Sequence, residues 1–106
     1  MSGDMKTVLR EVQACLAMLY GGRLRGVYLY GSYARGDYDA ESDFDVLVVL
    51  DDFRSYGAEV DRAAELTSAL SLQYGVSISE VFVREQEWRT GDSPFLRNAR
   101  EEAVAA

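Results

Sequence analysis

Apolar residues recur along the chain at two spacings, and each spacing predicts one kind of element. Apolar side chains three and four positions apart, typical of amphipathic helices, predict helices over residues 5–20 and 55–73. Runs of Val, Leu and Ile bounded by polar residues predict strands over 24–30, 43–50 and 76–83. The pattern therefore alternates helices and strands along most of the chain.

Capping residues predict the remaining elements toward the C-terminus. Ser93 followed by Pro94 is a typical N-cap and first helical residue, so a last helix is predicted to about residue 103. A short helical turn is expected around residues 85–88. No internal repeat, low-complexity segment or linker interrupts the pattern, and residues 1–106 are expected to form a single domain.

The stretch from Gly31 to Asp45 combines a Gly-Ser turn with a pair of aspartates. Gly31 directly follows one predicted strand, while Asp43 and Asp45 open the next. Alternate residues of a strand project from the same face, so the two aspartates are expected on one face with Cα atoms about 6.5–7 Å apart. Two carboxylates at this spacing favour one or two Mg²⁺ ions, since Mg²⁺ prefers oxygen ligands and completes its shell with water and phosphate.

The Gly-Ser half of the stretch is suited to an anion such as the phosphates of a nucleotide. Gly31 allows close backbone approach, and the free amides at the start of a short helical turn attract anions. Ser32 adds a hydroxyl donor and Arg35 adds a positive charge. The residues therefore predict that Gly31, Ser32 and Arg35 bind a nucleoside triphosphate beside the aspartate pair.

The Gly-Ser pair, ten intervening residues and the Asp-x-Asp pair resemble the signature of the minimal nucleotidyltransferases of the DNA polymerase β-like superfamily. The segment 93–98 also resembles one that is common in small stand-alone members. The resemblance implies an α+β fold, in which a small mixed sheet of three or more strands is backed by helices in an αβαβ core. It further implies Mg²⁺-dependent transfer of a nucleotidyl group, with Asp43 and Asp45 as catalytic carboxylates and metal ligands.

Family members with full activity typically carry a third carboxylate on a neighbouring strand, as a general base or third ligand. Within the predicted strand 76–83 the candidate is Glu80, at a position where the family usually has aspartate. Alternation puts Glu80 on the face of Ile78 and Phe82, and two outcomes stay open. On a core face the buried carboxylate needs a partner, and a metal would serve; on an open face it is an ordinary exposed acid. Glu80 is included as the third candidate catalytic residue.

The amino-acid composition argues against several classes of function. The net charge of −7, without an extended Lys or Arg cluster, argues against direct binding of DNA or RNA. The absence of histidine excludes a Ser-His-Asp triad, a histidine base and a histidine-rich zinc site. A single cysteine, Cys15, forms no internal disulfide, residues 1–4 do not resemble a targeting signal, and no apolar run is long enough for a bilayer. A cytoplasmic protein is expected.

The resemblance also implies a partner. Small stand-alone members of the family are often encoded beside a HEPN protein, an all-helical protein that can act as an RNase toxin. An antitoxin that transfers AMP from ATP to a hydroxyl of this partner, often a tyrosine, is therefore expected. The alternative is an inactive module with the same fold that neutralises its partner by contact. Modification of a small molecule fits less well because no second domain forms a pocket, and both a homodimer and a hetero-complex stay open.

Overall fold

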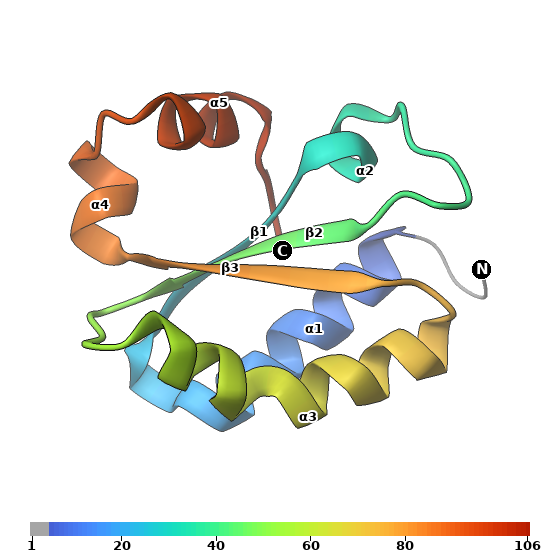
Figure 1. The fold of residues 1–106 in the computed structure, drawn as a ribbon, viewed down its shortest axis with the longest axis horizontal. Coiled ribbons are helices and arrows are strands. Elements are labelled where there is room, and N and C mark those ends of the chain that lie inside the picture. Colours follow the sequence, from blue (N-terminus) through green and yellow to red (C-terminus); the bar gives the residue numbers. More distant parts are fainter. Residues whose placement is uncertain (1–4) are drawn as a thin grey trace.

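The computed structural model describes residues 5–106, which fold around one four-stranded sheet (Figure 1). In chain order the elements are α1 (Met5–Tyr20), a 3-10 turn (Gly21–Arg23), β1 (Leu24–Tyr30), α2 (Gly31–Arg35), β2 (Phe44–Leu50), α3 (Tyr56–Tyr74), β3 (Ile78–Arg84), α4 (Glu85–Thr90), α5 (Pro94–Glu102) and β4 (Val104–Ala105). Residues 1–4, on which the expected absence of a targeting signal partly rests, lie outside the described part of the chain.

The sheet has the strand order β3-β2-β1-β4 and contains both parallel and antiparallel pairs. β2 runs parallel to β3, to which α3 connects it, and antiparallel to β1; the short β4 pairs antiparallel with the outer edge of β1. The register pairs Tyr30 of β1 with Asp45 of β2, and Asp45 with Ser79 of β3. Because paired residues project from the same face, this register decides which side chains meet.

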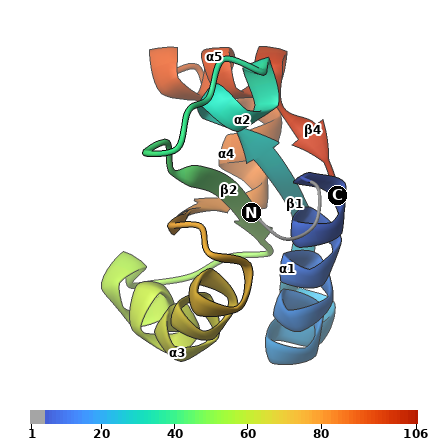
Figure 2. The ribbon, with the colours of Figure 1, turned by 90° about the vertical axis from the view of Figure 1, so that its right-hand side faces the viewer.

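Helices cover both faces of the sheet (Figures 1 and 2). α1 and α3 pack on one face, and α4 and α5 lie over the other. The central strand β2 is therefore buried on both sides, which explains its nearly continuous run of apolar residues. The larger core, under α1 and α3, takes Phe44, Val46, Val48 and Leu50 from this strand. The smaller core, under α4 and α5, takes Leu47 and Val49.

The elements predicted from the sequence are confirmed, with shifts of one or two residues at their ends. β2 begins at Phe44, one residue after Asp43, and α3 begins after Ser55, whose hydroxyl accepts a hydrogen bond from the Ala58 amide at 3.2 Å. The mixed sheet backed by helices confirms the expected α+β class. β4 was not predicted, because a strand of two residues carries no periodic signal.

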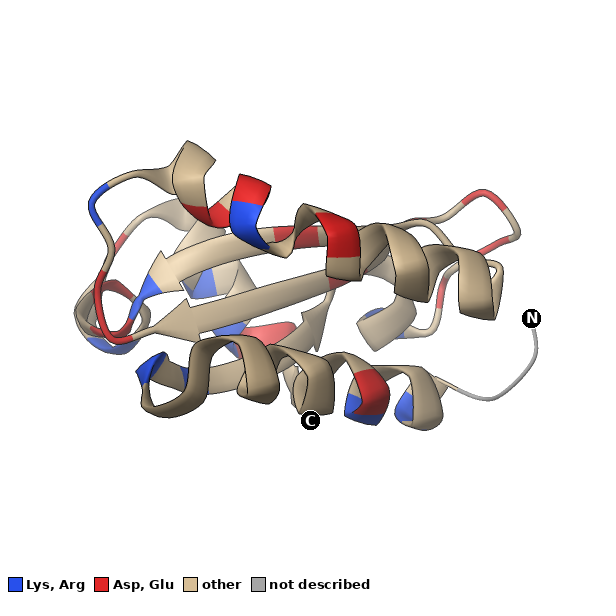
Figure 3. Ribbon diagram, turned by 90° about the horizontal axis from the view of Figure 1, so that it is seen from below, with Lys and Arg blue, Asp and Glu red and all other residues tan. Residues whose placement is uncertain are grey.

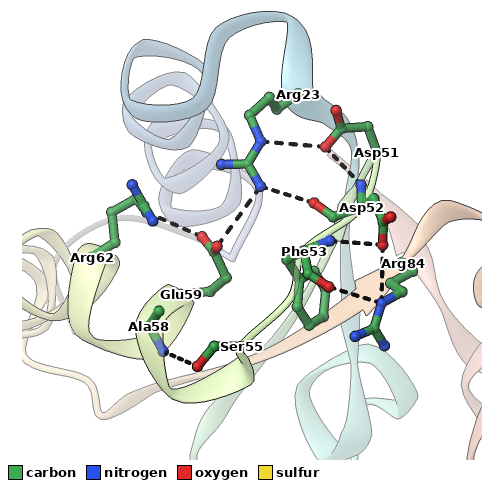
Figure 4. A network of polar contacts seen from close by, with 9 residues as sticks. All are labelled: Arg23, Asp51, Asp52, Phe53, Ser55, Ala58, Glu59, Arg62 and Arg84. Carbon is green, nitrogen blue, oxygen red and sulfur yellow. Dashed lines mark hydrogen bonds and ion pairs between the residues drawn. The ribbon is translucent and has the colours of Figure 1, made fainter.

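A network of charged side chains closes the end of the sheet where β2 stops (Figure 4). Glu59 of α3 is buried, and its carboxylate pairs with Arg62 at 3.2 Å and with Arg23 at 3.7 Å. Arg23 also donates to the Asp51 carboxylate at 3.3 Å and to the Asp52 carbonyl oxygen at 2.9 Å. Partners of opposite charge offset the desolvation of a buried carboxylate. The network therefore fixes the start of α3 against the loop that leaves β2.

Charged side chains are spread over the surface that α1 and α3 form. Lys and Arg stand there at separate positions, with Asp and Glu between them (Figure 3). This face does not present the continuous basic groove that nucleic-acid backbones require. Within residues 5–106, none of the helices combines the length and apolar character that a bilayer crossing needs.

Matched leucine substitutions test the assignment of the core. Leu16 on α1 is fully buried, whereas Leu72 on α3 is 86 % exposed. We expect Leu16→Ala to lower the free energy of unfolding by about 2–5 kcal/mol, since it removes buried methyl groups and leaves a cavity. Leu72→Ala should change it by less than about 0.5 kcal/mol. Urea denaturation followed by circular dichroism measures both variants, and equal losses would contradict the described packing.

Candidate active site

The site begins where β1 ends, at a glycine that lies against an aspartate of the neighbouring strand. Because Tyr30 is paired with Asp45 in the sheet, the next residue, Gly31, lies beside the Asp45 side chain. Gly31 has a φ of +76°, and a Cβ built on it would be 2.5 Å from Oδ2 of Asp45. Only glycine combines this backbone conformation with so close an approach. The chain then forms α2, which ends at Gly36 in the left-handed conformation.

Asp43 and Asp45 share one side of the sheet because they flank a residue that is buried on the other side. Phe44, between them, is fully buried in the core under α1 and α3, so alternation directs both aspartates toward the α5 side. Asp43 is exposed, and Asp45 is partly buried. Burial raises the pKa of Asp45, and the negative charge of Asp43 raises it further, while Arg35 opposes both effects. The pair therefore favours a cation that would relieve this repulsion.

Helix α5 forms the opposite wall of a cavity over the Gly31 turn. The cavity has a volume of about 640 Å³, within the range of about 300–1,000 Å³ that is typical of small-ligand sites. Gly31, Ser32, Arg35 and Asp45 line one side of it. From α5 it receives Phe95, Asn98, Ala99, Glu101 and Glu102. Four of these α5 residues follow the i, i+3, i+4, i+7 spacing that places side chains on one helix face.

Glu102 makes the most direct contact between α5 and the Gly31 turn. Its Oε1 accepts a hydrogen bond from the Gly31 amide at 3.0 Å, and its Oε2 lies 3.2 Å from Nη1 of Arg35. Arg35 also pairs with Asp37 at 3.2 Å. The amide and the guanidinium that the sequence assigns to an anion are thus already turned toward a carboxylate of the chain itself.

Two aromatic rings form the apolar part of the cavity wall. Tyr30 and Phe95 meet edge to face, with ring centroids 5.7 Å apart and an interplanar angle of 86°. Burial, and then the negative charge of Asp45, raise the pKa of Tyr30 to about 12. The phenol therefore stays protonated at neutral pH, so Tyr30 is a hydrogen-bond donor and packing group rather than a base.

The structure does not place Glu80 with the aspartate pair, and this part of the predicted site is corrected. Glu80 is paired with Val46, so its side chain projects toward α3, where the hydroxyl of Thr67 hydrogen-bonds its carboxylate. Burial raises the pKa of Glu80, and the bond from Thr67 opposes this shift. The residue of β3 that stands beside Asp45, on the cavity side, is Ser79. A shift of one residue in the pairing between β2 and β3 would therefore place the carboxylate of Glu80 beside Asp45, where the structure has the hydroxyl of Ser79.

The carboxylates present suit a Mg²⁺ ion that shares its ligands with a substrate. Across residues 5–106, no three side chains among His, Cys, Asp and Glu are grouped so that they could enclose a metal ion. Asp43 and Asp45 offer hard oxygen ligands on one side of β2. Mg²⁺ typically takes one or two carboxylates and completes its shell with water and phosphate oxygens. The donor set therefore fits Mg²⁺ bound together with a nucleotide.

The structure brings together most of the predicted site and adds one helix to it. Gly31, Ser32, Arg35 and Asp45 line a single cavity, and Asp43 adjoins Asp45 closely enough to shift its pKa. The α5 wall was not predicted. The spacing of residues along α5 could have shown that its inward residues share one helix face. The spacing does not indicate which other element that face contacts.

The family model of the nucleotidyltransferase domain matches residues 9–105 of the chain. The chain belongs to this family. A relative from Methanocaldococcus jannaschii with the name "Putative protein adenylyltransferase" is 37 % identical over 100 residues, which cover 89 % of each chain. The resemblance that the Gly-Ser and Asp-x-Asp motifs indicate is thereby confirmed.

Solved structures share the fold of this nucleotidyltransferase domain. A crystal structure of a toxin–antitoxin with AMP-PNP has a TM-score of 0.64 at 22 % identity, and the match covers 90 % of this chain and 69 % of that one. A tri-AMPylated Shewanella oneidensis HEPN toxin in complex with an MNT antitoxin gives 0.54 at 16 % identity, over 92 % and 70 % of the two chains. At these identities the likeness concerns the fold.

Gly31→Ala and Gly36→Ala form a matched pair in this nucleotidyltransferase, since both glycines have positive φ, +76° and +85°. A Cβ on Gly36 would meet nothing within 4 Å, whereas one on Gly31 would collide with Asp45. We expect Gly36→Ala to cost about 1–2 kcal/mol of unfolding free energy, the strain of the left-handed backbone. Gly31→Ala should cost more, because Asp45 must also move. Urea denaturation measures both, and equal costs would show that contact with Asp45 is unimportant.

Proposed function

We propose that the protein is a Mg²⁺-dependent nucleotidyltransferase that moves AMP from ATP to a hydroxyl group of a partner protein. The observation that carries this proposal is the contact between the Gly31 turn and Asp45, which sets phosphate-binding groups beside a metal-binding carboxylate in one cavity. The charge of Asp43, which lies outside the cavity lining, acts on this carboxylate. Membership of the nucleotidyltransferase family and the name of the M. jannaschii relative support the same class of reaction.

The residues of the Gly31 turn and the two aspartates each have a role in this proposal. The Gly31 amide, the Ser32 hydroxyl and the Arg35 guanidinium bind oxygens of the triphosphate, while Asp43 and Asp45 hold one or two Mg²⁺ ions. When bound, the metal supplies Lewis-acid stabilisation of charge on the phosphates. The residues orient the α-phosphate for attack by the acceptor hydroxyl: its oxygen bonds to the α-phosphorus, the bond to the β-phosphate oxygen breaks, pyrophosphate leaves, and the hydroxyl proton passes to water. Catalysis then rests on positioning and charge neutralisation, as in phosphoryl transfer generally.

The acceptor in this proposal arrives on another protein. Asp43, Phe95 and Asn98, around the cavity, are exposed, so a surface hydroxyl of a partner has access to it. The structural neighbour in which an AMPylated HEPN toxin is bound by an MNT antitoxin supports a HEPN protein as the partner and an antitoxin as the biological role. With this role, the proposed location of the pair is the cytoplasm.

A second candidate is a nucleotidyltransferase fold that binds its partner without modifying it. The observation that favours it is Ser79, which stands where active relatives are expected to carry a third carboxylate. Incubation with α-labelled ATP, Mg²⁺ and a candidate HEPN protein separates the two functions. Label on the partner supports the enzyme, and a tight complex without label supports the binding module.

Removal of both aspartates tests the location of the active site. We expect Asp43→Asn combined with Asp45→Asn to reduce label transfer by at least about a hundredfold, the scale that follows loss of a single stabilising group in an active site. Unfolding free energy should not fall, because the substitutions relieve repulsion between two neighbouring acids. Asp61→Asn, on the exposed side of α3, is the control. Unchanged transfer by the double variant would move the active site elsewhere.

Ser79→Asp tests whether the absent third carboxylate limits the rate. The register sets residue 79 beside Asp45, so the new carboxylate would face the cavity side of the sheet. We expect transfer to rise by about tenfold or more, since a positioned general base typically contributes at least this much. Glu80→Gln, one residue along and on the opposite face, should leave the rate unchanged. Loss of transfer in a folded Glu80→Gln variant would show that Glu80 takes part in the reaction despite its position on the α3 side of the sheet.

A further inference from the structure

The two groups that the proposed function assigns to phosphate oxygens already have an anionic partner within the chain. The Gly31 amide donates to Oε1 of Glu102 at 3.0 Å, and Nη1 of Arg35 lies 3.2 Å from Oε2. Carboxylate and phosphate oxygens are both acceptors that form short, charge-assisted hydrogen bonds with such donors. A triphosphate therefore gains these bonds only when Glu102 releases them.

The position of Glu102 is set by the structure on both sides of it. Glu102 is the last residue of α5, and β4 begins two residues later, where Val104 and Ala105 pair with β1. The amide of Ala106 donates to the carbonyl oxygen of Val27 at 3.0 Å. The side chain of Glu102 is 25 % exposed, so water reaches its contact with the Gly31 turn only in part. The carboxylate therefore lies over the turn in the free protein, in contact with the Gly31 amide and the Arg35 guanidinium.

The charge balance of the cavity adds to this competition. Among the residues that the structure describes, Arg35 is the one Lys or Arg that lines the cavity, together with Asp45, Glu101 and Glu102. The negative charge of Glu102 adds to that of Asp45, which lines the same cavity. An incoming triphosphate therefore meets repulsion from the same residue that occupies its ligands.

We propose that Glu102 is an internal competitor of the nucleotide: it occupies the phosphate ligands of the free protein and is displaced when a triphosphate binds. This inference rests on the proposed function, because it assigns the Gly31 amide and Arg35 to phosphate. Displacement frees the end of α5 from the Gly31 turn. The cavity wall that carries Phe95 and Asn98 is then coupled to occupation of the phosphate site, because these residues share the α5 face with Glu102.

Two alanine variants separate the contact of Glu102 from its charge. Glu101 precedes it, lines the same cavity and is exposed, and within residues 5–106 it forms no ion pair or hydrogen bond of its side chain. Calorimetry would measure the binding of tripolyphosphate and of AMP-PNP, each with Mg²⁺. The measurements use physiological ionic strength, where exposed charges are screened over about 8 Å. We expect Glu102→Ala to bind both probes at least about tenfold more tightly than the wild type, and Glu101→Ala to stay within about threefold.

Each other outcome overturns the inference. Equal gains in the two variants would assign the effect to net charge, and weaker binding by Glu102→Ala would show that Glu102 positions the phosphate ligands instead of competing for them. No binding of either probe by any variant overturns it as well. Thermal unfolding checks that the variants fold, and Glu102→Gln, which keeps the shape without the charge, should show a smaller gain in the same direction if Glu102→Ala unfolds.

Label transfer from ATP, measured on the same proteins, separates this inference from the proposed function. Transfer by the wild type without tighter binding by Glu102→Ala contradicts only the competition. Tighter binding by Glu102→Ala without transfer by any variant supports the competition and contradicts the enzymatic activity.

Discussion

The pairing of Tyr30 with Asp45 across β1 and β2 is the constraint on which the rest of the site depends. It brings the first residue after β1 against the Asp45 carboxylate, where the positive φ and the carboxylate that a Cβ would have to displace both favour glycine. Burial of Phe44 on the opposite face then directs both aspartates to the same side as the turn. Backbone pairing and one buried ring thus assemble two chemically distinct halves of a site without any direct bond between them.

Local sequence signals were sufficient for the elements other than β4 and for the positions of Gly31 and the two aspartates at strand ends. Gly31 and the aspartates stand at the ends of predicted strands, and strand ends of an antiparallel pair meet when a short connection joins them. Local signals could not show from which face of the sheet Glu80 projects, because this face depends on the register between β2 and β3. That register is set by packing between strands separated by α3, and a shift of one residue exchanges Glu80 for Ser79.

The wall formed by α5 illustrates the same limit at longer range. Its inward residues share a helix face that the spacing of the sequence could reveal. The element that this face meets is decided by the position of α5 over the sheet, some seventy residues after the turn that it contacts. A glutamate at the end of that helix has no local signature that distinguishes it from a solvated helix terminus. The role of this glutamate becomes apparent only in the folded protein, where its carboxylate contacts the amide and the guanidinium of the Gly31 turn.

The charged network around Glu59 lies at the opposite end of β2 from the aspartate pair. A strand of seven residues, Phe44–Leu50, separates the two by about 20 Å, more than twice the screening length at physiological ionic strength. Substitutions in the two regions share no partner, and free-energy changes at such separations usually add. The charged side chains therefore form two independent groups: the ion pairs around Glu59 at one end of β2, and the aspartate pair with its cavity at the other. Directed evolution can therefore change the charged residues of one region without compensating substitutions in the other.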